Sequence, residues 1–204
     1  MADLDPRTGK VLKRSTSFMG FNTIHRNGGD AYMTRFWFGR LRLHIFHRGD
    51  DDQDPHDHPW GFWTFPLHSY VEEVTEKVVR TNWSDTGAYE TEVYEKRLQV
   101  VPAWRWNKRD AEHMHRVLGR YTGYVADPFD DHVRFSAGTA AAHDSRTFVP
   151  QWEPLNGRKL VTIVIRTGFT RKHGWGFLKN RDGKWCWIHS KEYIASGGSP
   201  GPCE

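Results

Sequence analysis

Three histidines in two short segments have the spacing of a metal site. The segment DPHDHPW, at positions 54 to 60, holds His56 and His58 two residues apart. Because side chains two apart on a strand point to the same face, both imidazoles can reach one cation. The segment EHMHRV, at positions 112 to 117, offers His115 as a third ligand from another strand. Imidazole nitrogens suit zinc, copper, iron and nickel, and three of them leave coordination positions open for water or substrate.

A histidine pair of this kind also arises by chance among surface or core histidines, so its neighbours matter. By the same period-two argument His113 shares a face with His115. It is then an acid, base or ligand-orienting group in the cavity, or it lies at the rim without a chemical role. Tyr70 is the second candidate catalytic residue. The candidate substrate contacts are Arg42, Arg48, Trp60, His68 and Arg116. Trp60 can instead be a core residue.

Alternating and β-branched segments predict the strands that must position these side chains. In RFWFGRLRLHIFH, from 35 to 47, a strand or a bent pair of strands separates Leu41, Leu43 and Ile45 from Arg42, His44 and Phe46. A turn at 82–87 predicts a hairpin that returns through 89–99. Further strands are expected at 62–74, 98–106, 113–117 and 160–166, with a closing hairpin of 174–179 and 184–189 and a short helical turn at 191–195.

The order of these motifs resembles the cupin superfamily over about Phe36 to Tyr193. The resemblance is carried by the acids before HDHPW, by the hydrophobic strand after it, and by Pro102 followed thirteen residues on by His115. It implies an all-β fold, a single cupin-type double-stranded β-helix or jelly-roll barrel. It also places His56 and His58 in the first cupin motif and His115 in the second.

The glutamate that usually accompanies the first cupin motif is missing, because its place falls at Phe62 or Trp63. The resemblance therefore implies a three-histidine face for one divalent metal ion, with iron expected first and zinc, nickel or manganese as the other choices. Glu72 lies too far along its strand to replace the missing ligand. We expect it to be solvated or ion-paired.

The length favours one domain. We expect an N-terminal arm at 1–18, a cupin-like barrel at 19–193 and a flexible tail at 194–204. An insertion or lid is expected at 119–157, where the pattern weakens. Its two histidines, His132 and His143, are expected to be solvated.

Composition favours a cytoplasmic protein with a small-molecule partner. The 29 Lys and Arg residues are interleaved with 25 Asp and Glu residues, so nucleic acid is not an expected partner. No segment has the length of a signal peptide or a membrane span. The two cysteines, Cys186 and Cys203, do not resemble a disulfide framework, which favours a reducing compartment. The many aromatic residues leave room for a homodimer.

The leading functional hypothesis is a metal-dependent small-molecule enzyme, similar to the cupin dioxygenases that activate oxygen on ferrous iron. Two alternatives stay open. One is a non-redox sugar or nucleotide-sugar isomerase or epimerase, in which His113 and Tyr70 move protons. The other is a non-catalytic protein that binds a nucleotide or another anion through Arg42, Arg48 and Arg116. The resemblance is strongest to small bacterial and phage cupin-like proteins without an assigned activity.

Overall fold

A computed structural model describes residues 3–4, 11–15, 18–25, 30–50, 53–126, 148–170, 174–198 and 202–203. These residues form fourteen strands and one short helix, so the predicted all-β fold is confirmed. The elements are β1 (Asp3–Leu4), β2 (Val11–Ser15), β3 (Met19–His25), β4 (Ala31–Phe38), β5 (Leu41–Phe46), β6 (Trp60–Pro66), β7 (Tyr70–Ser84), β8 (Gly87–Val101), β9 (Asn107–Arg109), β10 (Met114–Ala126), β11 (Phe148–Glu153), β12 (Leu160–Thr170), β13 (Gly176–Arg181), β14 (Lys184–His189) and α1 (Ser190–Ala195).

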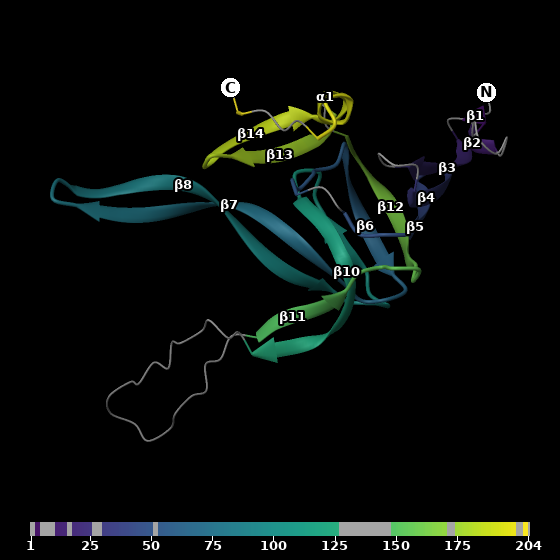
Figure 1. The fold of residues 1–204 in the computed structure, drawn as a ribbon, viewed down its shortest axis with the longest axis horizontal. Coiled ribbons are helices and arrows are strands. Elements are labelled where there is room, and N and C mark those ends of the chain that lie inside the picture. Colours follow the sequence, from purple (N-terminus) through teal and green to yellow (C-terminus); the bar gives the residue numbers. More distant parts are fainter. Residues whose placement is uncertain are drawn as a thin grey trace, which may run out of the picture.

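Two antiparallel sheets make up the jelly roll (Figure 1). The larger sheet has the order β1-β2-β3-β4-β5-β12-β6-β9, and the smaller has the order β11-β10-β7-β8. In the larger sheet, β12 lies between β5 and β6 and pairs with both, although it comes more than 90 residues later in the chain. A cluster of buried apolar side chains lies between the sheets, made of Tyr70, Val101, Val117, Leu155 and Leu160.

An interior strand of the larger sheet, β12, covers the strand that the sequence predicted at 160–166. It pairs with β5 on one side and β6 on the other. Leu160, Thr162 and Val164 are buried, whereas Ile165 is exposed. Alternate side chains of β12 therefore face the barrel interior, and the partner residues in β5 and β6 face it with them.

The hairpin of β7 and β8 extends well beyond the barrel (Figure 1). The strands pair from Tyr70 with Val101 to Ser84 with Gly87, so the turn falls where the sequence predicted it. Among the described strands, β10 borders β7 only as far as Thr75. The outer half is a two-stranded arm, with ion pairs between its strands such as Arg97 to Glu76 at 2.7 Å.

The C-terminal hairpin of β13 and β14, which the sequence also predicted, forms a separate two-stranded sheet. A disulfide bond joins Cys186 on this hairpin to Cys203, and their Cα atoms are 5.7 Å apart. The Lys179 ammonium donates to the Pro202 carbonyl oxygen at 3.1 Å. The cysteines are thus paired, contrary to the sequence interpretation, and they no longer argue for a reducing compartment.

The predicted insertion at 119–157 begins inside an ordered strand. Residues 119–126 continue β10, and β11 pairs with them from Arg120 with Glu153 to Ala126 with Phe148. Residues 127–147, with His132 and His143, lie outside the described residues. Among the described residues no helix is both long enough and apolar enough to cross a membrane.

Candidate metal centre

The segment that carries His56 and His58 is held between β10 and β13 by backbone hydrogen bonds. The His56 N–H donates to the His115 carbonyl oxygen at 2.9 Å, and the His115 N–H donates back at 3.0 Å. On the other side the Asp57 N–H donates to the Gly176 carbonyl oxygen at 3.0 Å. Because His56 pairs directly with His115, residues 59 positions apart in the sequence lie side by side.

One potential ligand atom from each of His56, His58 and His115 lies within 4.8 Å of the others. The Nε2 atoms of His58 and His115 are 2.9 Å apart. Burial, followed by the neighbouring histidine His115, holds the pKa of His58 well below its usual range. The donor set is three imidazoles, which suits zinc, iron, nickel or copper better than the oxygen-seeking calcium or magnesium.

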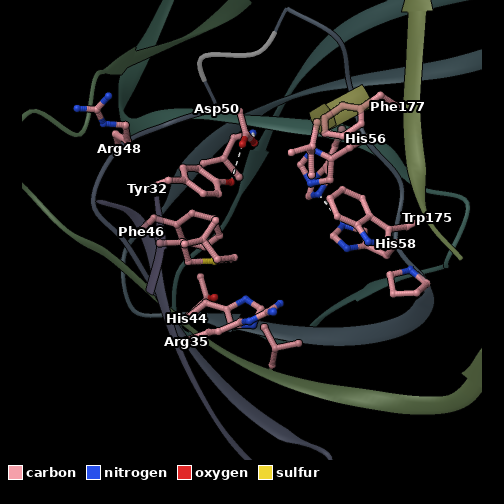
Figure 2. Close-up of a pocket in the computed structure, with 18 of the residues that line it drawn as sticks. Tyr32, Arg35, His44, Phe46, Arg48, Asp50, His56, His58, Trp175 and Phe177 are labelled. Carbon is pink, nitrogen blue, oxygen red and sulfur yellow. Dashed lines mark hydrogen bonds between the residues drawn. The ribbon is translucent and has the colours of Figure 1, made fainter. Parts of the chain in front are cut away.

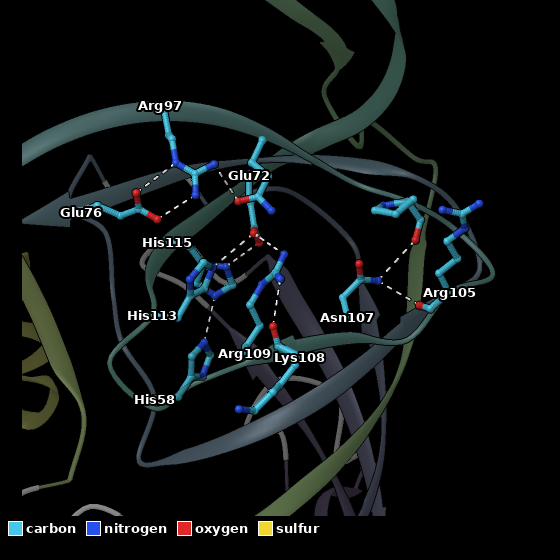
Figure 3. A network of polar contacts seen from close by, with 12 residues as sticks. His58, Glu72, Glu76, Arg97, Arg105, Asn107, Lys108, Arg109, His113 and His115 are labelled. Atoms are coloured by element: carbon cyan, nitrogen blue, oxygen red, sulfur yellow. Dashed lines mark hydrogen bonds and ion pairs between the residues drawn. The ribbon is translucent and has the colours of Figure 1, made fainter.

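A buried carboxylate, Glu72, fixes the orientation of His115 (Figure 3). Its Oε2 lies 2.8 Å from His115 Nδ1, and its Oε1 lies 2.6 Å from an Arg109 nitrogen. Burial alone raises the pKa of Glu72, but His115, His113 and Arg109 together hold that pKa well below its usual range. As a carboxylate, Glu72 can only accept a hydrogen bond, so His115 Nδ1–H is the donor and His115 Nε2, which faces His58, is the atom that could bind a metal.

Glu72, His113 and His115 also come close enough to hold an ion. Glu72 is 0% exposed, however, and the Arg109 guanidinium already occupies one of its oxygens at 2.6 Å. A second cation there would face the charge of Arg109 in a poorly solvated place. This group therefore supports the histidine ligands and does not form a second metal site. Of the two expectations for Glu72, it is ion-paired and not solvated.

Asp57, between the two histidines, points away from them and holds the C-terminal hairpin. Its Oδ1 accepts the Gly176 N–H at 2.7 Å, and its Oδ2 accepts the Trp187 indole N–H at 3.0 Å. Asp54 acts similarly, accepting two Arg181 nitrogens at 2.9 and 2.8 Å and the Tyr193 hydroxyl at 2.8 Å. These two acids lock the histidine segment onto β13 and β14.

The three histidines open onto a cavity of about 660 Å³ inside the barrel (Figure 2). Aromatic side chains line its wall beside the metal centre, including Phe62, Trp175 and Phe177. Phe62 stands where a cupin glutamate was expected, and its ring centroid lies 4.7 Å from that of His58. Within the described chain, that part of the wall is apolar and gives no fourth ligand.

The structure brings some of the predicted site residues to this cavity and leaves others outside it. Tyr70, Arg48 and Trp60 line the cavity. Burial, followed by the charge of Glu72, raises the pKa of Tyr70 well above its usual range. Arg48 also pairs with Asp30 at 2.7 Å, near the surface.

Four other predicted residues lie elsewhere. Arg42 lines a smaller cavity next to Trp60. His113 lies beside His115, with ring centroids 4.9 Å apart, and its Nε2 is 3.2 Å from Glu72 Oε1, so it does not line the cavity. Arg116 lies between two inward-facing residues of β10, so its side chain takes the outer face and pairs with Glu73 at 3.0 Å.

The last of the four, His68, is exposed in the connection between β6 and β7. The sequence predicted one strand over 62–74, which would contain His68, but β6 ends at Pro66. The alternation of side chains between two faces applies only within a strand, so it does not reach His68.

Sequence reasoning missed the part of the cavity opposite the histidines, although it suggested His44. There His44 and Arg35 lie together, as do Tyr32 and Asp50 (Figure 2). The Tyr32 hydroxyl donates to Asp50 Oδ1 at 2.5 Å. The predicted bent pair of strands at 35–47 could have identified Arg35. It stands opposite His44 in the pairing of β4 with β5, so the two side chains share a face.

His44 is expected to make stability depend on pH. Burial, with the charges of Arg35 and Arg42, lowers the pKa of His44 from 6.5 to about 3. The unfolded chain therefore binds a proton at higher pH than the folded one. The contribution of His44 to stability is complete above pH 6.5 and is lost as the pH falls toward 3. At about 1.4 kcal/mol per pH unit, up to about 2 kcal/mol is lost by pH 5.

Urea denaturation of metal-free protein at several pH values checks this expectation. The free energy of unfolding of H44Q should fall less between pH 7 and pH 5 than that of the wild type. The exposed-histidine variant H68Q should follow the wild type more closely than H44Q does. If H44Q and the wild type lose stability equally over this range, His44 is not held neutral in the folded state.

Comparisons with known proteins do not assign this chain to a family. No family model matches the sequence, and no curated protein is similar to it at a significant level. Among solved structures, one similar chain is described as "Crystal Structure of FeII HppE". It has 10% sequence identity and a TM-score of 0.36, over 82% of this chain and 64% of that chain. This protein thus covers less than two thirds of that neighbour, and its fold is assigned from its own sheets and their register.

Proposed function

We propose that this protein is a metal-dependent enzyme acting on a small molecule, with a cupin-type barrel that holds one divalent metal ion on His56, His58 and His115. The observation that carries the proposal is the convergence of the three potential ligand atoms within 4.8 Å of one another. They converge at the wall of a cavity large enough for a small molecule.

The supporting residues fit this role. Glu72 orients His115 through a 2.8 Å hydrogen bond, as carboxylates behind metal-bound histidines commonly do. Three protein ligands leave open positions, and a ferrous ion there would supply one-electron and oxygen chemistry of the dioxygenase kind. Phe62, Trp175 and Phe177 give the cavity an apolar wall beside the histidines, as is common where a small molecule binds. Tyr70 keeps its phenolic proton and can donate a hydrogen bond to a bound molecule.

Elemental analysis of protein purified without added metal tests the proposal. We expect near-stoichiometric iron, zinc, nickel or manganese in the wild type, and its loss in the double variant H56A/H115A. The variant H68A, which removes an exposed histidine, should keep the metal. Circular dichroism and thermal denaturation establish that each variant is folded. A folded wild type that takes up none of these four metals, even when each is supplied, would contradict the proposal.

Oxygen consumption by the iron-loaded protein over a panel of small carboxylates, phosphates and sugars tests the dioxygenase assignment. We expect uptake with at least one compound, and none in H56A/H115A. Turnover of a sugar that survives complete chelation would instead favour the isomerase. The structure offers that alternative less support, because His113 and Tyr70 do not face the same cavity.

A further inference from the structure

Three arginines gather at the edge of the cavity, on the inner face of the larger sheet. Arg42 of β5 stands opposite Val164 of β12, and Arg166 is two residues further along the same face. Arg35 of β4 stands opposite His44, two residues from Arg42 on β5. Because partners across a ladder share a face, the three guanidinium groups lie on neighbouring strands and point the same way.

Two tryptophans complete this group. Trp37 is the cross-strand partner of Arg42. The Arg166 guanidinium carbon lies 5.0 Å from the centroid of the Trp60 ring, within the range of a cation–π contact. A cavity of about 170 Å³ is lined by Arg35, Trp37, Arg42 and Trp60. Arg35 and Trp60 also line the large cavity, so the two spaces adjoin.

The charge of this group is not neutralised by the described part of the protein. Arg35 donates from Nε to the Asn22 amide oxygen at 2.7 Å, and Arg42 donates to the Gly39 and Leu41 carbonyl oxygens. Arg166 has its buried Nε without a hydrogen-bond partner. By contrast, Arg97, Arg109 and Arg181 each meet a carboxylate within 3 Å. Three neighbouring cations without a carboxylate repel one another, which a bound anion relieves.

We propose that Arg35, Arg42 and Arg166, with Trp37 and Trp60, form a binding site for an oxyanion group at the mouth of the cavity. As a statement about the substrate, this rests on the function proposed above. The substrate is then a small molecule with a carboxylate or phosphate at one end, held by the guanidinium forks. Its remaining part extends past Trp60 toward the three histidines. The tryptophan rings favour a planar or apolar group next to the anion.

Isothermal titration of metal-free protein with phenyl phosphate, benzoate and benzyl alcohol tests this site. The three probes share a phenyl ring and differ in the charged group, so they distinguish a phosphate from a carboxylate. We expect one or both anions to bind and the neutral alcohol not to bind. R42Q and R166Q should each weaken anion binding about tenfold or more, since each loses a charged hydrogen bond. R42K, which keeps the charge without the fork, should fall between R42Q and the wild type.

The control is R40Q. Arg40 is an exposed arginine in the turn between β4 and β5, whereas Arg42 and Arg166 are partly buried on the inner face of the sheet. R40Q removes the same charge from the same region, so it should bind the anions as the wild type does. A general effect of net charge would instead weaken R40Q and R42Q alike, and this would overturn the site. Equal binding in wild type, R42Q and R166Q, or no binding of either anion, would overturn it too.

The experiments distinguish a failure of the metal proposal from a failure of the anion proposal. H115A, which removes a metal ligand outside the arginine group, should still bind the anionic probe. If the wild type binds no metal, but R42Q and R166Q lose the anion and R40Q keeps it, the enzyme proposal fails and the oxyanion site stands. If the wild type binds metal but neither anion, the reverse holds.

Discussion

Replacing Glu72 with alanine is expected to destabilise the folded protein by about 3–5 kcal/mol. Glu72 is completely buried and contacts Arg109, His113 and His115 at 2.6, 3.2 and 2.8 Å. Its removal leaves the Arg109 guanidinium in the interior without a counter-charge. Urea denaturation of wild type and E72A, both without metal, measures the difference in the free energy of unfolding.

The neighbouring glutamate provides the control. Glu73 faces the outer side of the same strand and pairs with Arg116 and Lys96 where solvent reaches all three. E73A should therefore cost at most about 1 kcal/mol. E72Q keeps the shape of the side chain, and we expect it to weaken zinc binding about 10- to 100-fold through His115. A loss below 1 kcal/mol in E72A would show that Arg109 finds another partner or reaches water.

The substitution D57N is expected to destabilise the protein by about 3 kcal/mol and to loosen the C-terminal hairpin. Asp57 is 1% exposed and accepts the Gly176 N–H and the Trp187 indole N–H. An asparagine can accept only one of them, because its amide nitrogen is itself a donor. Each hydrogen bond to a charged acceptor contributes about 1.5–3 kcal/mol.

Hydrogen exchange locates this effect. In D57N the amides of β13 and β14 should exchange faster than those of β5 and β12, which a uniform loss of stability would not produce. D85N, at the exposed tip of the β7–β8 hairpin, makes the same chemical change and should be neutral. Unchanged protection of β13 and β14 in D57N would mean that the hairpin is held by its other contacts.

Much of the fold could be predicted because it depends on local patterns. The turn at 82–87, the closing hairpin and the apolar run of β12 each leave a signal within about ten residues. The residue types made His115 a candidate third ligand, and the resemblance supported it, but spacing alone does not show which strands are neighbours. The structure supplies that neighbour relationship through the pairing of His56 with His115.

What could not be predicted depends on register. The contact of Glu72 with His115 is an example, because separation along the chain does not give the register of β7 against β10. In the structure Val117 pairs with Glu72 and His115 pairs with Val74, so the glutamate and His115 are diagonal neighbours on one face. Such contacts are within reach of long side chains. The same alternation takes Arg116 to the outer face, while the end of β6 at Pro66 leaves His68 outside the sheet.

The disulfide illustrates another limit. Cys186 and Cys203 are 17 residues apart, and no pattern in the sequence links them. They meet because the chain after α1 returns along the C-terminal hairpin, where the Lys179 ammonium contacts the Pro202 carbonyl oxygen. A count of two cysteines was therefore a poor guide to their chemical state.

The free-standing arm of β7 and β8 has a consequence for solubility. Beyond Thr75 the described strands leave both outer edges of the arm with unpaired backbone groups, and Trp83 near its end is 81% exposed. Such an edge invites a strand from another molecule to add to it. Charged side chains lie along the arm as the ion pairs Lys77–Glu92 and Arg80–Glu95. A strand that paired with the edge would have to desolvate these charges, which opposes self-association.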